Sequence, residues 1–442
     1  MEEIIWQCPC GDIKGTLDEG AAVFRGVPYA ETKRFEAPQL VESWNGVYDG
    51  TKEEKDCYQF SAFQSEEGRF YAKEFRSNRS FVYDESHMTL NIVSPVESRG
   101  KKKKNCPVLM FIHGGSFETG TVGELPYGTT KAYAKEDVVF ISIGYRLNVF
   151  GLYGGINYML LDQIAAVDWV KKNISAFGGN SDNITLIGQS AGAMCVFDLL
   201  CSPLLKGKIK GAIMMSGAGV FPKFGEAQLK EAVAPFWKNM DDILGEDAKE
   251  APAKELWFAW KKARNTKNPF VGLRSSQPCI DGVTLLKRQR EIVKKGELLD
   301  VPLMVGVTSQ DMLPIFLYDM ALKLGLNCAK QHHQPVYGYF FDRTLPGNSY
   351  KAFHACDLWY MFGNMDQSWR PFEETDYRLH EEMVRDVAEY CKTGKPKNPD
   401  WMPISGKSKG FRHYDGTDRG MVSPDYCKKK VRHTMFFDRG PA

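Results

Sequence analysis

The chain has 442 residues, 43% hydrophobic and 25% charged, a composition typical of a folded globular protein with a sizeable core. Its 57 Lys and Arg residues nearly balance 55 Asp and Glu residues, so the formal charge is only +2. Such a balance gives no broad basic field for nucleic acid. No apolar run approaches the ~18 residues of a membrane-spanning helix. Composition therefore excludes a disordered chain, a strongly basic nucleic-acid-binding protein and a membrane-spanning helix.

Cysteine usage and the N-terminal segment indicate the compartment. The eleven cysteines are scattered and odd in number, which favours reduced thiols over a disulfide framework. Cys8 and Cys10 form a close pair, but no second pair of ligands follows at a zinc-site spacing. The N-terminal MEEIIWQCPCG is acidic and lacks the basic and apolar regions of a secretory signal. We therefore expect a cytoplasmic protein.

Apolar segments alternate with helical patterns along the chain, and no repeat or low-complexity linker divides it. Buried strands are expected at 106–115, 137–148, 183–188, 209–217 and 301–307, and helices at 161–180 and 191–200. The first of these helices is expected to stop at Gly178 and Gly179. Such alternation predicts an α/β fold with a mainly parallel central sheet and helices on both faces. We expect a single domain over residues 1–442.

A serine stands between two glycines in LIGQSAGAM (186–194), after a predicted strand and before a predicted helix. Gly188, Ser190 and Gly192 fit the G-x-S-x-G pattern of a nucleophile elbow, in which the serine lies on a sharp strand-to-helix turn. Small flanking residues allow the close backbone approach that such a turn requires. The pattern predicts that Ser190 is a catalytic nucleophile.

A second motif, FIHGGSF (111–117), follows an earlier predicted strand. It is similar to the H-G-G motif whose backbone N–H groups complete an oxyanion hole with the amide after the nucleophile. We expect Gly115, Ser116 and Ala191 to supply these amides. His113 is expected to orient the loop.

Together with these motifs, several others make the chain resemble the type-B carboxylesterases, which include cholinesterases and bacterial p-nitrobenzyl-type esterases. The others are FRGVPYAE, GYRLNVFG, LDQIAAVDWVKKNISAFGGN, QPCIDG, VPLMVGVTSQD, VYGYFFDR and FHACDLWYMFG. The resemblance covers nearly the whole chain and implies the α/β-hydrolase fold. It also implies that Asp311 is the acid and His354 the base of a catalytic triad. The order Ser, Asp, His agrees with that fold.

The chain departs from the family pattern near the site. Gln189 stands where many relatives have glutamate, which implies a weak preference for cationic choline esters. His87 occupies the position of a family cysteine, so Cys57 has lost its expected partner. Ser216 resembles a family serine that hydrogen-bonds behind the triad, and a purely structural serine at a strand end is an equal alternative.

The acid and the histidine are only 43 positions apart, in a family where a longer helical insertion usually separates them. We expect this shortened insertion to leave a more open active-site mouth that admits bulkier esters. Phe117, Trp359 and Tyr360 either line a pocket or belong to the core.

The sequence thus predicts a serine hydrolase that cleaves small-molecule carboxylic esters through an acyl-enzyme, with no metal or organic cofactor. Two alternatives stay open: acyl transfer by the same triad, and a non-catalytic cholinesterase-like interaction protein. Presence of the whole triad and of the oxyanion motif argues against the second. No nucleic-acid partner and no membrane span are expected. The acyl group, the alcohol and the oligomeric state are not determined by the sequence.

Overall fold

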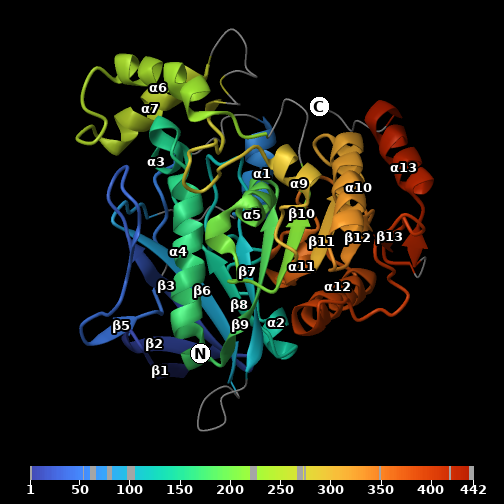
Figure 1. Cartoon of the computed structure of the whole chain (residues 1–442). Coiled ribbons are helices and arrows are strands. Elements are labelled where there is room, and N and C mark those ends of the chain that lie inside the picture. Colours follow the sequence, from blue (N-terminus) through green and yellow to red (C-terminus); the bar gives the residue numbers. More distant parts are fainter. Residues whose placement is uncertain are drawn as a thin grey trace.

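The computed structural model describes residues 2–52, 54–59, 66–76, 82–96, 105–219, 226–265, 272, 275–347, 350–417 and 420–437. One sheet of 14 strands runs through this part of the chain (Figure 1). In spatial order its strands are β1 (Glu2–Cys8), β2 (Gly11–Asp18), β3 (Ala21–Glu31), β6 (His87–Pro95), β8 (Val139–Ile143), β7 (Cys106–Ile112), β9 (Gly179–Gln189), β10 (Gly211–Met215), β11 (Leu303–Thr308), β12 (Val336–Phe341), β13 (Phe411–Tyr414) and β14 (Met421–Val422). Two short strands pair at the side, β4 (Gln39–Leu40) with β3 and β5 (Val47–Asp49) with β2.

The middle of the sheet is parallel and its N-terminal edge is antiparallel. Strands β8, β7, β9, β10, β11, β12 and β13 form one continuous parallel set. Strands β1, β2, β3 and β6 pair antiparallel, and β6 joins β8 in the same sense. The mainly parallel sheet expected from the sequence is confirmed.

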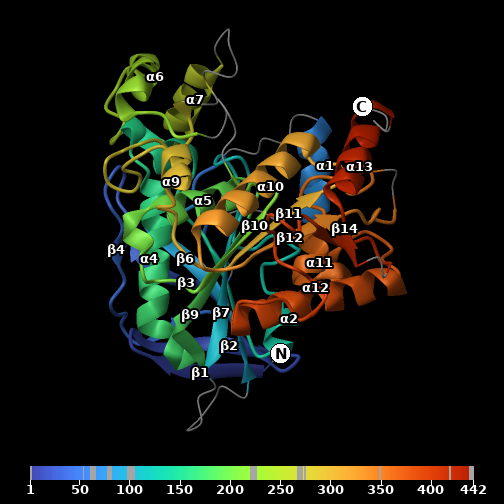
Figure 2. The same ribbon diagram turned by 45° about the vertical axis from the view of Figure 1, so that its right-hand side comes forward.

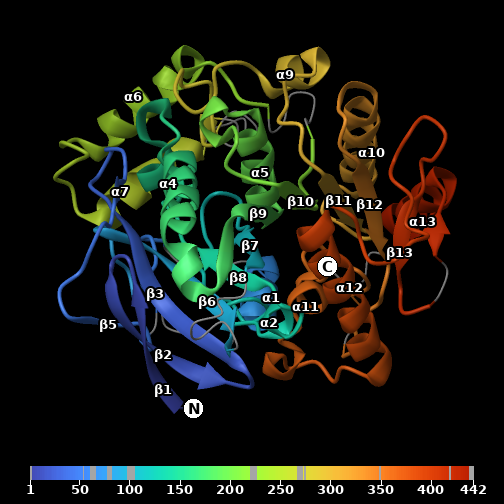
Figure 3. The ribbon, with the colours of Figure 1, turned by 60° about the horizontal axis from the view of Figure 1, so that its bottom comes forward.

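Helices cover both faces of the sheet, as the views in Figures 1 and 3 show. They are α1 (Glu66–Phe75), α2 (Ala132–Lys135), α3 (Asn148–Leu152), α4 (Tyr158–Asn173), α5 (Ala191–Cys201), α6 (Lys230–Leu244), α7 (Ala253–Arg264), α9 (Gln289–Lys295), α10 (Pro314–Gln331), α11 (Leu358–Phe362), α12 (Glu374–Thr393) and α13 (Pro424–Phe437). Short 3-10 turns lie at Tyr153–Gly155, Ile174–Phe177, Pro203–Leu205 and Met365–Gln367. No helix in the described ranges is both long and apolar enough to cross a bilayer.

Strand β7 shows how the core divides into two halves. Val108, Met110 and Ile112 belong to one buried cluster, with residues of α4, α5 and α10, whereas Leu109 and Phe111 belong to a second, with residues of α2, α11 and α12. Successive side chains of a strand point to opposite faces. The strand is therefore buried on both sides, as the continuous apolar run in its sequence indicates.

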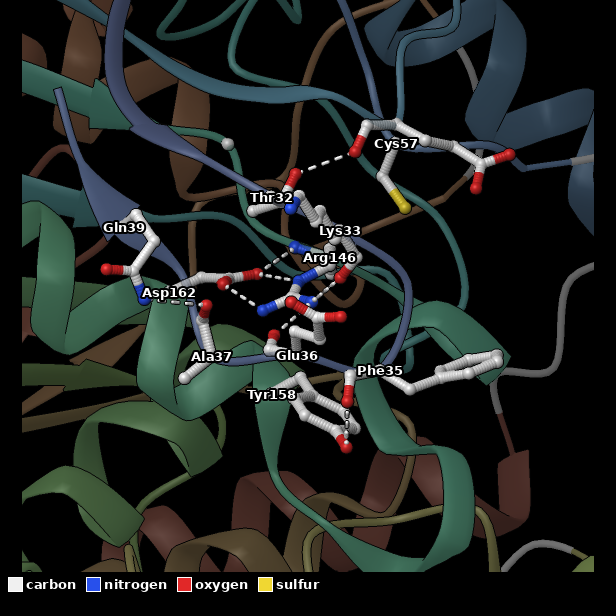
Figure 4. Close-up of polar contacts among 12 residues, drawn as sticks. Thr32, Lys33, Phe35, Glu36, Ala37, Gln39, Cys57, Arg146, Tyr158 and Asp162 are labelled. Carbon is white, nitrogen blue, oxygen red and sulfur yellow. Dashed lines mark hydrogen bonds and ion pairs between the residues drawn. The ribbon is translucent and has the colours of Figure 1, made fainter. Parts of the chain in front are cut away.

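A buried ion pair fixes the chain that follows β8 (Figure 4). Arg146 donates to both carboxylate oxygens of Asp162 on α4, at 2.8 and 2.7 Å, and to the carbonyls of Lys33 and Glu36 at 3.2 and 2.8 Å. Because every one of these bonds is buried or partly buried, loss of either charge would leave the other without compensation. The pair ties the segment after β3 to helix α4.

All eleven cysteines lie in the described part of the chain, and each is a free thiol. Cys57 is buried, and its Sγ accepts a hydrogen bond from the amide of Leu147 at 3.3 Å. The absence of a bond to residue 87 follows from the sequence, because His87 cannot form a disulfide.

Candidate active site

Ser190 is half-buried on the turn that joins β9 to α5. Its backbone has φ 56° and ψ −122°, a conformation that costs a non-glycine residue free energy and is found at functional turns. A Cβ on Gly188 would lie 2.3 Å from the carbonyl oxygen of Gly192, and one on Gly192 would lie 2.1 Å from that of Ile112. Both positions therefore require glycine, which explains why the serine is flanked by them.

Asp311 and His354 come together from two different connections of the sheet, the first just after β11 and the second just before α11. The Nδ1 atom of His354 lies 2.5 Å from Oδ1 of Asp311. The amides of Thr308 and Met312 also donate to the Asp311 carboxylate, at 3.3 and 2.9 Å. Burial opposes ionisation of Asp311, but the charge and hydrogen bond of His354 hold its pKa below the ordinary value. An ionised carboxylate thus fixes the orientation of the imidazole.

Two further residues noted in the sequence lie beside this pair. The side-chain nitrogen of Gln189 is 3.3 Å from Nε2 of His354, the ring nitrogen that does not face Asp311. Ser216 is buried after β10, and its hydroxyl helps to lower the pKa of Asp311. Gln189 therefore lies against the histidine, and Ser216 favours the ionised form of the carboxylate.

The loop after β7 brings backbone amides to the same place. Gly115 and Ser116 have φ values of 112° and 58°, and both line a cavity with Ser190. Their amides donate no hydrogen bond to any group in the described ranges of the chain. Ala191 is the first residue of α5, where a backbone N–H has no partner within the helix. These three amides can therefore bind an oxygen that gains negative charge.

His113 supports this loop from behind. It is buried, its Nδ1 atom lies 2.8 Å from the carbonyl oxygen of Gly114, and its ring stacks on Tyr145 at 4.5 Å between centroids. Burial lowers the pKa of His113 to about 4, so the ring is neutral at physiological pH and donates from Nδ1 to that carbonyl.

A cavity of about 300 Å³ opens in front of these groups, at the lower end of the range for small-molecule sites. Its motif residues are Gly114, Gly115, Ser116, Gln189, Ser190 and His354. The rest of its lining comes from Tyr71, Phe75, Arg76, Glu118, Thr119, Glu124, Tyr127, Met312, Ala355 and Leu358. The cavity reaches the surface beside Met312, which is 61% exposed.

Between Asp311 and His354 the chain forms α10 and β12. The greater access for bulky esters that we expect from this short segment stays a prediction. Phe117, Trp359 and Tyr360, which the sequence placed in either the pocket or the core, are all buried core residues and do not line the cavity.

The sequence did not indicate two features of the site. Helix α1 supplies Tyr71 and Phe75 to the cavity, and their i, i+4 spacing was the only available signal. Asp357, three positions after His354, is fully buried and accepts a hydrogen bond from the Tyr339 hydroxyl at 2.9 Å. Burial raises the pKa of Asp357 to about 7. A lone aspartate in an apolar segment gives no sign of such an environment.

The parallel sheet with a serine on the turn after a central strand defines an α/β-hydrolase. Solved structures agree: a thermophilic PNB esterase matches with a TM-score of 0.83 at 25% identity, over 97% of this chain and 99% of that one. The carboxylesterase family model matches residues 2–332 and 319–435, and the chain belongs to this family.

Curated relatives carry esterase names. The para-nitrobenzyl esterase of Bacillus subtilis (strain 168) is 29% identical over 80% of this chain and 82% of its own length. Carboxylesterase 4A of Bos taurus is 27% identical over 90% of this chain and 88% of its own, and the cocaine esterase of Homo sapiens is 32% identical over 68% and 53%. The chain is a serine carboxylic-ester hydrolase of small-molecule esters, and neither sequence-derived alternative is favoured.

Proposed function

We propose that Ser190, His354 and Asp311 are the nucleophile, the general base and the orienting acid of this esterase. The observation that carries the proposal is the 2.5 Å contact between His354 and Asp311 beside a cavity that Ser190 also lines. A serine hydroxyl is a weak nucleophile at neutral pH and needs a base whose tautomer a carboxylate fixes. Asp311 accepts from Nδ1, which leaves Nε2 as the atom that takes the serine proton.

The reaction follows from these roles. Ser190 Oγ attacks the ester carbonyl as its proton passes to Nε2 of His354, and the carbonyl oxygen becomes an oxyanion. The amides of Gly115, Ser116 and Ala191 bind that oxygen, and loss of one such donor typically costs about 10²–10³ in rate. The tetrahedral intermediate expels the alcohol, which takes the proton from His354. Water then attacks the acyl-enzyme by the same steps, releasing the acid and restoring Ser190.

Ser216 and Gln189 support the triad in this proposal. The Ser216 hydroxyl helps to keep Asp311 ionised, and a charged carboxylate stabilises the imidazolium that forms during attack. Gln189 is neutral, so it adds no second negative charge at Nε2 of His354. The absence of a charge at position 189 removes one attraction for a cationic alcohol, which supports a weak preference for choline esters.

The free thiols support a cytoplasmic location, and the single sheet through the described residues supports one domain over residues 1–442. Eleven free cysteines, ten of them buried, are typical of proteins kept in a reducing compartment. Fractionation of cells that make the protein tests this location, and recovery from the medium would contradict it.

The test of the triad is hydrolysis of p-nitrophenyl acetate, butyrate and octanoate by the parent protein and by Ser190→Ala. Removing the nucleophile of a serine protease lowers turnover by about 10⁶, so the variant should fall to the background rate on all three esters. Ser175→Ala, which changes an exposed serine outside the cavity, is the matched control and should keep the parent activity. Parent-like activity in Ser190→Ala would refute the assignment. A separate assay of the parent protein with added ethanol would reveal acyl transfer as an ethyl ester product.

A further inference from the structure

Glu74, on α1, is a fully buried carboxylate that receives four hydrogen bonds. Trp359 Nε1 donates to it at 2.8 Å and Trp369 Nε1 at 3.2 Å. Arg370 donates from Nε at 2.7 Å and from Nη2 at 3.0 Å, and both side chains of this ion pair are 0% exposed. All four donors lie in residues 359–370, which begin five positions after His354. These four hydrogen bonds therefore join α1 to residues 359–370, on the C-terminal side of His354.

The same helix presents two aromatic side chains to the cavity. Tyr71 and Phe75 both line it, and the Tyr71 hydroxyl donates to the carbonyl oxygen of His354 at 3.3 Å. The Phe70 ring meets Phe353 at 5.1 Å and the Phe75 ring meets Trp359 at 6.2 Å between centroids. Figure 2 shows α1, blue, among the orange and red elements of the C-terminal part. Helix α1 thus contacts the backbone of the histidine itself.

The C-terminal end of α1 is tied to the opposite wall. Arg76 Nε donates to Glu124 at 2.9 Å, and the amide of Leu125 donates to the carbonyl oxygen of Phe75 at 2.9 Å. Residues 124 and 125 follow the loop that carries Gly115 and Ser116. Helix α1 therefore spans the cavity from the histidine side to the oxyanion side.

We propose that Glu74 is a positioning residue for the esterase reaction. By docking α1 onto 359–370, it holds Tyr71 against the His354 carbonyl and sets the aromatic wall that contacts the part of a larger ester beyond its reacting group. Breaking a buried ion pair by neutralising one partner leaves an uncompensated charge in the interior, which destabilises the packing around it. A shift of about 1 Å in a catalytic group can cost about 10²-fold in rate. The inference rests on the catalytic role proposed for His354.

The experiment measures kcat and KM for p-nitrophenyl acetate and octanoate in Glu74→Gln, Tyr71→Phe and the double variant. Glu74→Gln should lower kcat on both esters at least tenfold and should raise KM more for octanoate. Tyr71→Phe, which removes one hydroxyl, should lower kcat several-fold with little change in Tm. If Glu74 acts through Tyr71, the two effects on kcat will not multiply in the double variant.

Glu382→Gln is a control at a second, partly exposed glutamate–arginine pair, with Arg412 of β13, whose residues do not line the cavity. It should lower Tm and leave kcat and KM within about twofold. Kinetic constants of Glu74→Gln within twofold of the parent, measured well below its Tm, would overturn the proposal. If Glu74→Gln does not fold, an unchanged kcat in Tyr71→Phe would overturn it instead. Activity that survives Ser190→Ala would refute the proposed triad, an outcome distinct from a kinetically silent Glu74→Gln.

Discussion

Gln189 lies against the nitrogen of His354 that accepts the serine proton in the proposed mechanism, at 3.3 Å. Its side chain can donate to an unprotonated Nε2 but carries no charge. The carboxylate that contacts the base is Asp311, whose pKa the histidine itself holds low. Activity should rise with pH as His354 loses its proton, because only the neutral imidazole can act as the base.

Replacing Gln189 by glutamate tests this description of the base. A second carboxylate near Nε2 favours the imidazolium, so the pKa of His354 rises and the acid limb of kcat/KM moves to higher pH, by about one unit. Gln189→Met, which is neutral and similar in size, should leave the limb in place. The pH profile of p-nitrophenyl butyrate hydrolysis measures both, and an unmoved limb in Gln189→Glu would show that residue 189 does not face the base.

The elements that position the nucleophile are β7, β9 and α5, and the end of β7 approaches α5 closely at Gly192. A Cβ at this position would lie 2.1 Å from the carbonyl oxygen of Ile112 and 2.5 Å from that of His113. Because both neighbours are backbone atoms, neither can rotate away. The strand that carries the oxyanion loop would have to move relative to the elbow.

Gly192→Ala should therefore lower both stability and turnover. Overpacking of this kind typically costs about 1–3 kcal/mol, and the displaced loop should reduce kcat. Gly406→Ala is the control, since nothing lies within 4 Å of a Cβ there and its φ is not in the left-handed region. Urea denaturation gives the stability of the two variants, and ester hydrolysis gives their kcat. Equal stability and equal kcat in Gly192→Ala and Gly406→Ala would show that β7 and α5 do not approach closely at Gly192.

At the scale of helices and strands, the sequence predicts the features that depend on residues close together in the chain. Strands β7 and β9, helix α5 and the turn at Ser190 follow from apolar runs and glycine spacing within a few residues of one another. Helix α1 and its contacts could not be predicted in this way, because Tyr71 meets His354 across 283 positions and Glu74 meets Arg370 across 296. No pattern in the neighbourhood of Glu74 indicates that its partners lie in the last quarter of the chain.

At the scale of the whole molecule, buried carboxyls set part of the pH dependence of stability. Asp198, on α5, is fully enclosed and accepts a hydrogen bond from Gln289 at 2.6 Å. Burial raises the pKa of Asp198 from 3.8 to about 7, against the opposing effect of Gln289. The folded state then binds more protons than the unfolded state between these values, so this residue makes the protein less stable as pH rises through that window.

Asp198→Asn should remove this dependence, because an amide keeps the acceptor for Gln289 but cannot ionise. Relative to the parent, the variant should become more stable as pH rises from about 4 to 7. Above that range the gain in the free energy of unfolding should stay constant, on the order of a few kcal/mol at pH 8. Asp242→Asn, at an exposed pair with Lys238, should show no such gain. The measurement is the free energy of unfolding of both variants and the parent at pH 5 and pH 8. A gain for Asp198→Asn that is the same at both pH values would show that ionisation of Asp198 does not lower stability.

The most direct measurement of the central claim is rapid mixing of the protein with excess p-nitrophenyl butyrate, followed by acid quenching and peptide mass analysis. An acyl-enzyme on Ser190 predicts trapped butyryl mass on the peptide that contains LIGQSAGAM, lost in Ser190→Ala. Where deacylation is the slower step, it also predicts a burst of p-nitrophenol equal to the number of active sites. Butyryl mass on another residue, or a burst of p-nitrophenol with no butyryl mass on the Ser190 peptide, would contradict the account.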